Sequence, residues 1–134
     1  MPDFVLDKRL AASTVQALDL PVSRVLVMDD ARYPWLVFVP RRAHLTEMFE
    51  LPAADRVLLT EELTVAAERL KALTGCHKIN VANLGNVVPQ LHIHVIARNV
   101  GDAAWPGPVW GKGEAVPYEP RALEDFVHAV VHMF

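Results

Sequence analysis

The stretch NVVPQLHIHVIAR, Asn86–Arg98, determines how the rest of the chain is interpreted. From Gln90 onward polar and apolar residues alternate, and successive side chains of a strand point to opposite faces of its sheet. The apolar positions are Leu91, Ile93 and Val95, and the polar positions are Gln90, His92 and His94. The pattern predicts a strand whose apolar face enters a core and whose polar face is an accessible row of one amide and two imidazoles.

Further elements are predicted on both sides of this strand. β-Branched and aromatic residues favour strands over residues 23–30, 35–40 and 77–84, and an apolar stripe of period 3.6 favours helices over 52–75 and 120–134. The link of residues 85–89 is short, so the histidine strand and the strand before it are expected to be antiparallel neighbours. Strands, a helix, strands and a helix in this order predict an α+β domain with an antiparallel sheet.

Length and composition restrict the class of protein. The 134 residues suit a single domain over 1–134, and 52% hydrophobic with 22% charged residues is typical of a globular chain. A net charge of -3 argues against a nucleic-acid partner, and the single cysteine, Cys76, cannot form an internal disulfide. We find no apolar run long enough to cross a membrane and no signal-peptide core, so we expect a cytoplasmic location without membrane contact.

The segment after the histidine strand differs in composition. Residues 99–120 are rich in Gly, Pro and Trp and form a connection longer than most. Trp105 and Trp110 are costly to leave in solvent, so we interpret them as packing or dimer contacts rather than as a platform for stacking bases. We predict that Gly101–Gly113 shapes the substrate site across a dimer interface and is not a free tail.

Three interpretations of the histidine pair remain open on the residues alone. The pair could be ordinary solvent-facing residues, or it could bind a metal ion, since two histidines two apart on a strand can reach one ion. No Asp or Glu follows before Asp102 to complete such a metal site. The third interpretation is a nucleophilic histidine, because a neutral imidazole can attack phosphorus and form a covalent intermediate.

The chain resembles the histidine triad (HIT) family. QLHIHVIAR, residues 90–98, is similar to the family signature His-φ-His-φ-His-φ-φ, with glutamine in place of the first histidine. VFVPRRAHLTEMFEL and INVANLGNVVPQLHIH, residues 37–51 and 79–94, resemble further family segments, and the likeness covers a core of residues 23–98. The glutamine and the tail of residues 99–134, with its Trp/Gly/Pro loop and helix, resemble a bacterial branch described as diadenosine tetraphosphate hydrolase-like. The resemblance implies a five-stranded antiparallel sheet with one long helix and a C-terminal helix, assembled as a homodimer.

The resemblance also implies catalytic roles. His92 takes the place of the family nucleophile, which attacks the α-phosphate of a nucleotide, and His94 takes the place of the residue that orients the phosphate and assists the leaving group. His44 stands at the upstream histidine beside the site. At Gln90 the backbone carbonyl that orients the nucleophile is retained, whereas the amide side chain can donate to a phosphate oxygen but cannot carry a proton.

Three residues are implied in binding the nucleotide. Asn83 matches the asparagine before the phosphate loop, Asn86 lies within that loop, and Asp29 falls near the position that holds the ribose hydroxyls. Asp30 fits that last position nearly as well.

These observations lead to one preferred function and two alternatives. We expect a nucleotide hydrolase or nucleotidyl transferase that acts at the α-phosphate of a dinucleoside polyphosphate, a phosphoramidate or a related ester, with no cofactor and no metal. The first alternative is a nucleotide-binding HIT-fold module with little or no turnover, which the glutamine at Gln90 favours. The second is a metal-dependent hydrolase that uses the histidine pair.

Overall fold

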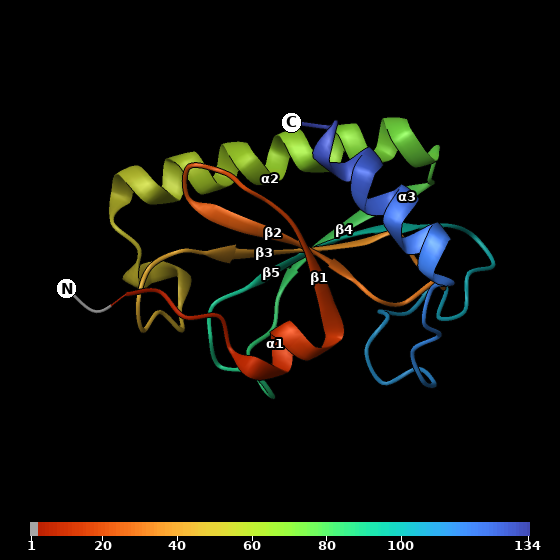
Figure 1. The fold of residues 1–134 in the computed structure, drawn as a ribbon, viewed down its shortest axis with the longest axis horizontal. Helices are drawn as coiled ribbons and strands as arrows, with labels where there is room; N and C mark the ends of the chain where they lie inside the picture. Colours follow the sequence, from red (N-terminus) through yellow and green to blue (C-terminus); the bar gives the residue numbers. More distant parts are fainter. Residues whose placement is uncertain (1–2) are drawn as a thin grey trace.

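The computed structural model describes residues 3–134, in which five strands form one antiparallel sheet in the order β1-β2-β3-β5-β4 (Figure 1). The strands are β1 (Thr14–Asp19), β2 (Ser23–Met28), β3 (Trp35–Pro40), β4 (Lys78–Asn83) and β5 (Ile93–Arg98). The helices are α1 (Lys8–Ser13), α2 (Ala53–Thr74) and α3 (Pro120–Val131), with a 3-10 turn over Met48–Glu50. This arrangement confirms the predicted α+β fold.

The predicted pairing of the histidine strand with the strand before it and the predicted long helix are both present. β2 and β3 pair antiparallel with Ser23 opposite Pro40, and β4 and β5 pair with Asn83 opposite Ile93. Gly75 ends α2 in the left-handed conformation, at a φ of 66°, which glycine adopts without steric cost.

Two elements near the N-terminus were not predicted. α1 has only six residues, and β1 is an edge strand that buries none of its side chains fully. Neither has the regular apolar spacing that identified the other elements. The side chain of Asp7 accepts a hydrogen bond from the backbone N–H of Arg9 and caps α1, which is a local signal that the sequence does contain.

The two faces of the sheet are covered by different parts of the chain. α2 and α3 cover one face, where Leu59, Leu70 and Val130 join the main core. Leu10 of α1 and Val109 of the C-terminal loop pack on the opposite face, with aromatic residues of the β2–β3 hairpin. β5 lies between β3 and β4, so both of its edges are paired, and all of its residues are buried, so the histidine strand is covered on both faces. Within residues 3–134 no helix is long and apolar enough to span a membrane.

Candidate active site

The histidine stretch enters the sheet three residues later than the sequence pattern suggests, because β5 begins at Ile93 and not at Gln90. The apolar positions Leu91, Ile93 and Val95 lie in the core as predicted. The prediction that the polar row is accessible was wrong, since His92 is 5% exposed and His94 is 3% exposed. Their face of the strand is covered by aromatic side chains that come from distant parts of the chain.

His92 is held by the backbone of the residue two positions before it. Its Nδ1 atom lies 2.6 Å from the carbonyl oxygen of Gln90. A carbonyl oxygen can only accept a hydrogen bond, so a neutral His92 carries its proton on Nδ1. The Nε2 atom therefore has a free lone pair, and no residue in the described part of the chain forms a hydrogen bond with it.

His94 is held in the opposite tautomer. The indole Nε1–H of Trp35 donates to Nδ1 of His94 at 2.9 Å, and an indole N–H can only donate. A neutral His94 therefore carries its proton on Nε2. Burial, with a smaller contribution from the nearby His92, lowers the pKa of His94 to about 3, so the ring is neutral at physiological pH.

The two imidazoles present complementary groups to one hollow. Their ring centroids are 4.9 Å apart in an edge-to-face arrangement, and both rings line a hollow of about 330 Å³. The hollow is lined by Arg9, Leu10, Ser13, Met28, Leu84, Asn86, Val87, Val88, His92, His94 and Trp110. A nitrogen lone pair beside an N–H donor suits attack at an electrophilic centre that also carries an oxygen able to accept a hydrogen bond.

Gln90 is placed differently from the expectation for its side chain. The side-chain Nε2 donates to the carbonyl of Val5 at 2.8 Å, and the side-chain Oε1 accepts from the backbone N–H of Asp7 at 2.8 Å. The amide is thus bonded to the N-terminal segment and does not line the hollow of the histidine pair. Only its backbone carbonyl, through His92, acts on that hollow as expected.

His44 and the aspartates at the end of β2 also lie outside the lining of this hollow. His44 is exposed, has a φ of 60°, and lines an adjoining hollow of about 350 Å³ together with Gln90. Asp29 accepts a hydrogen bond from the backbone N–H of Tyr118 at 2.9 Å. Asp30 is buried and forms an ion pair of 2.8 Å with Arg32. Both carboxylates hold neighbouring segments, and this explains why neither is directed to the hollow.

The two asparagines remain close to the histidine pair. Asn86 lines the hollow of His92 and His94 and also an adjacent one of about 430 Å³. Asn83, at the end of β4, lines only the adjacent one, next to Gly85. The structure therefore groups His92, His94 and Asn86, with Asn83 one hollow away.

The segment Gly101–Gly113, predicted to shape the substrate site, supplies Trp110 to the hollow from within the same chain, whereas the sequence had indicated a packing or dimer contact for this residue. The Trp110 ring centroid lies 4.9 Å from that of His94 and 6.0 Å from that of Trp35. Buried Arg98 anchors the loop, because its Nε and Nη2 atoms donate to Asp102 at 2.8 and 2.9 Å. A further Nη2 bond of 2.8 Å reaches the carbonyl of Gly107. The loop is thus an ordered wall of the site within its own chain.

The remaining missed residues come from the N-terminal half. Arg9, Leu10, Ser13 and Met28 line the hollow, and Trp35 fixes His94. These residues lie about 60 or more positions from the histidine pair, and no local pattern connects them with it. The N-cap at Asp7, which predicts a helix over the following residues, is the one signal that could have drawn attention to Arg9.

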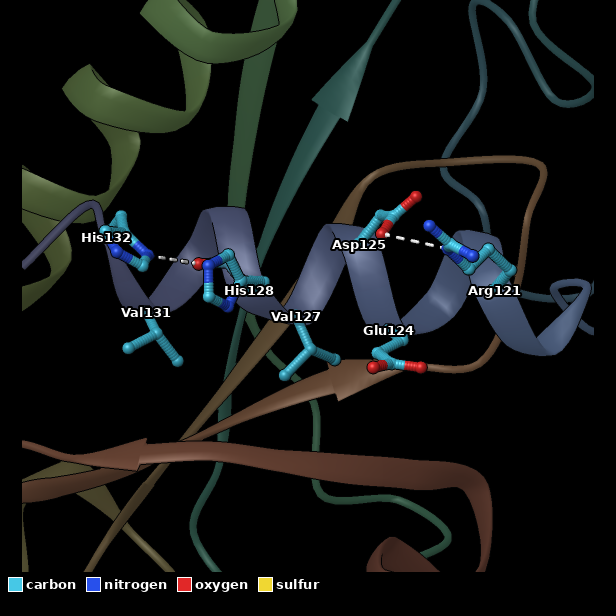
Figure 2. Close-up of a pocket in the computed structure, with 7 residues that line it drawn as sticks. All are labelled: Arg121, Glu124, Asp125, Val127, His128, Val131 and His132. Carbon is cyan, nitrogen blue, oxygen red and sulfur yellow. Dashed lines mark hydrogen bonds and ion pairs between the residues drawn. The ribbon is translucent and has the colours of Figure 1, made fainter.

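Another hollow lies away from the histidine pair, along the exposed side of α3 (Figure 2). It measures about 520 Å³ and is lined only by residues of that region, including His128 and His132. The two rings are 4.4 Å apart, and Nδ1 of His132 is bonded to the carbonyl of His128 at 2.8 Å. Across residues 3–134, no three His, Cys, Asp or Glu side chains gather as a metal would require, either here or at His92. Both Nδ1 atoms of the central pair are also already engaged.

Comparisons with known proteins agree with this fold. The HIT domain family matches residues 11–101, a longer span than the resemblance over residues 23–98. A histidine triad protein from Bradyrhizobium japonicum is 43% identical, with a TM-score of 0.96 and coverage of 98% of each chain. One from Sinorhizobium meliloti is 44% identical, with a TM-score of 0.95 and coverage of 98% of this chain and 97% of that one.

A more distant likeness shows the fold alone. Diadenosine triphosphate hydrolase from Plasmodium falciparum is 13% identical, with a TM-score of 0.62 and coverage of 98% of this chain and 84% of that one. A comparison with curated proteins finds no significant match. The family match over most of the chain and the two close structures establish that this chain belongs to the histidine triad family.

Proposed function

We propose that this protein is a nucleotide hydrolase or nucleotidyl transferase that acts at the α-phosphate of a nucleotide derivative through a covalent nucleotidyl-His92 intermediate. The observation that carries the proposal is the pair of opposite tautomers. The Gln90 carbonyl leaves the lone pair on His92 Nε2, and the Trp35 indole leaves the proton on His94 Nε2. Membership of a family that includes a diadenosine triphosphate hydrolase supports the substrate class.

The first step forms a bond between His92 Nε2 and the α-phosphorus. The bond from phosphorus to the bridging oxygen or nitrogen breaks at the same time, and its electron pair goes to the leaving group. A bridging nitrogen also takes up a proton from solvent and leaves as an amine. His94 donates its Nε2–H to an oxygen at the reacting phosphate, where charge develops. The low pKa of His94 keeps the ring neutral, so His94 acts here as a hydrogen-bond donor and not as a charged acid.

The second step releases the nucleotide. Water attacks the phosphorus, the phosphorus–nitrogen bond breaks with its electron pair returning to His92, and the water proton is transferred to solvent. A nucleoside monophosphate leaves. In a transferase another nucleophile takes the place of water. We assign the phosphate to Asn86, which lines the same hollow, and a more peripheral part of the nucleotide to Asn83, which lines the adjacent hollow.

Replacing the nucleophile tests this function. The substitution His92→Ala should abolish turnover of a dinucleoside polyphosphate while nucleotide affinity stays within about tenfold, since the other lining residues remain. Turnover and affinity are measured on the same preparation. A variant that retains more than a small fraction of the wild-type activity would show that His92 is not the nucleophile.

A binding module with little turnover is the second candidate. It is favoured by Gln90, whose side chain is engaged with Val5 and Asp7 and cannot carry a proton for the leaving group. A burst of leaving group equal to the protein concentration, without steady hydrolysis, would identify this module. Activity that is lost in a strong chelator would instead favour the metal-dependent hydrolase.

We further propose a homodimer as the working form. β4 is an edge strand of the sheet, and Val81 on it is 52% exposed, which leaves both backbone groups and an apolar side chain available to a second copy. Sedimentation equilibrium of the wild type and of Val81→Lys tests this. The variant should shift toward the monomer, and an unchanged dimer would exclude this edge.

A further inference from the structure

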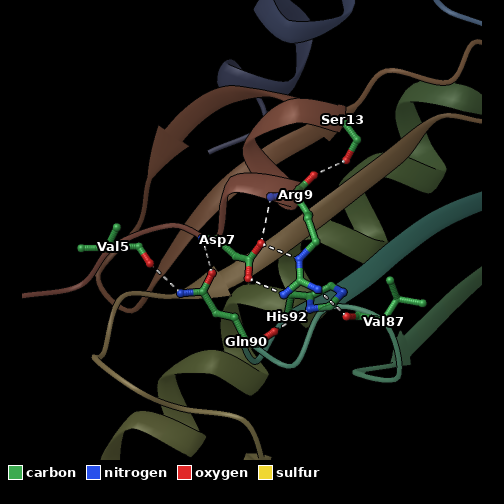
Figure 3. Close-up of polar contacts among 7 residues, drawn as sticks. All are labelled: Val5, Asp7, Arg9, Ser13, Val87, Gln90 and His92. Atoms are coloured by element: carbon green, nitrogen blue, oxygen red, sulfur yellow. Dashed lines mark hydrogen bonds and ion pairs between the residues drawn. The ribbon is translucent and has the colours of Figure 1, made fainter.

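The side chain of Gln90 fastens the N-terminal segment to the site (Figure 3). Its amide donates to the Val5 carbonyl and accepts from the Asp7 N–H, both at 2.8 Å, much as a neighbouring strand would. Its backbone carbonyl holds His92 at 2.6 Å. One residue therefore fixes the position of the nucleophile and the path of residues 5–7.

The path of this segment brings Arg9 to the hollow. The Nε and Nη2 atoms of Arg9 donate to the two carboxylate oxygens of Asp7 at 3.1 and 2.9 Å. Its Nη1 donates to the carbonyl of Val87, on the loop before the histidines, at 2.9 Å. Three of the five guanidinium N–H groups are used in this way, and two remain for a ligand. Asp7 stays ionised in the pair because the hydrogen bond from Arg9 lowers its pKa.

Arg9 is the one formally charged side chain among the described residues that line the hollow, since His94 is neutral and the others are polar or apolar. Its side chain is 56% exposed, so the guanidinium lies at the mouth and not in the interior. A planar guanidinium held on one edge by a carboxylate presents its remaining N–H groups in a fixed direction, which suits a phosphate oxygen.

We propose that Arg9 selects substrates whose leaving group is a phosphate, and that Gln90 positions Arg9 for this task by fastening residues 5–7. The inference rests on the proposed function and extends it to the leaving group. As His92 Nε2 bonds to the α-phosphorus, the bridging phosphorus–oxygen bond breaks, its electron pair goes to the departing phosphate, and Arg9 stabilises that charge. An amine leaving group takes up a proton from solvent as the phosphorus–nitrogen bond breaks, so it departs neutral, develops no such anion and has no use for Arg9.

The test compares two substrates that form the same adenylyl-His92 intermediate. Diadenosine triphosphate releases ADP, whereas an adenosine 5′-(N-alkyl)phosphoramidate releases an amine. The variants are Arg9→Ala, Arg9→Lys and, as a matched control, Lys8→Ala, which removes the neighbouring positive charge without touching the lining. Arg9→Ala should lower kcat/KM for diadenosine triphosphate about 10- to 100-fold and for the phosphoramidate less than threefold. Arg9→Lys should recover part of the loss, and Lys8→Ala should change neither value.

Gln90→Ala tests the second half of the proposal. It keeps the backbone carbonyl that holds His92 but removes both bonds to the N-terminal segment. The ratio of the two kcat/KM values should fall as in Arg9→Ala, and the Asp7 amide should exchange its hydrogen faster. Both substrates react with His92, so an effect of the substitution on His92 cancels in the ratio of the two kcat/KM values. An unchanged ratio in Gln90→Ala would overturn the role of Gln90.

The other outcomes are equally decisive. An equal loss on both substrates, or no loss on either, in Arg9→Ala would overturn the assignment of Arg9. If the wild type turns over neither substrate, the proposed function fails. The role of Arg9 is then tested by the affinities for ADP and AMP. The wild type should bind ADP more tightly than AMP, and Arg9→Ala should abolish that preference. Equal binding of ADP and AMP by the wild type would refute the inference.

Discussion

Replacing His94 by Asn should make the protein less sensitive to acid. Asn keeps a hydrogen-bond acceptor, Oδ1, close to the place of the Nδ1 atom that accepts from Trp35. It cannot be protonated in the range where histidine titrates. The variant therefore removes one titrating group from the core and keeps its main contact.

The size of the effect follows from the burial of His94. An unfolded histidine has a pKa of about 6.5, whereas burial lowers the pKa of His94 to about 3. Between these values the unfolded chain binds a proton that the native state does not, so stability falls as the pH falls. At about 1.4 kcal/mol per pH unit, lowering the pH from 6.5 to 4.5 costs the wild type up to about 2.7 kcal/mol through this residue.

Urea unfolding of both proteins at pH 7.5 and pH 4.5 measures this difference. Other groups that titrate in this range contribute to both proteins and cancel in the comparison. The wild type should lose more free energy of unfolding than His94→Asn on going to pH 4.5, by an amount on the order of 2 kcal/mol. Equal losses would refute the conclusion that the core holds His94 in its neutral form.

Two further substitutions test the surroundings of the histidine pair. Trp35→Phe removes the donor to His94 Nδ1 and should lower kcat about tenfold, with a change of the His94 ring ¹⁵N shifts that reports a mixed tautomer. Tyr33→Phe is its control, because within residues 3–134 the buried Tyr33 hydroxyl has no hydrogen-bond partner, and this variant should keep both activity and shifts. Arg98→Met leaves Asp102 buried without its partner. Thermal unfolding should show a loss of about 3–5 kcal/mol of unfolding free energy, and tryptophan fluorescence should show a loosened Trp110 loop. Arg121→Ala removes an exposed ion pair and should cost less than about 1 kcal/mol; a similar cost for both would contradict the role of Arg98 as an anchor.

The sequence was sufficient for elements with a regular pattern or a clear end signal. The apolar stripe and Gly75 defined α2, and alternation placed Leu91, Ile93 and Val95 in the core. α1 and β1 were missed because a six-residue helix and an exposed edge strand carry no such pattern.

The candidate site was predictable only in part. The bond from His92 to the Gln90 carbonyl spans only two residues, and the resemblance to the family implied it. The burial of the pair could not, since Trp35 meets His94 across 59 positions of sequence. The partners of the Gln90 amide lie 83 and 85 positions away, so the side chain was assigned to phosphate rather than to the N-terminal segment.

The central claim is that His92 becomes covalently bonded to a nucleotide. Its most direct measurement is intact-protein and peptide mass spectrometry after rapid mixing with diadenosine triphosphate and quenching at alkaline pH, where a phosphorus–nitrogen bond to histidine survives. The proposed mechanism predicts one added adenylyl group per chain, located on His92, that disappears at the rate of steady turnover and is absent from His92→Ala. Turnover without any adduct, or an adduct on another residue, would contradict it.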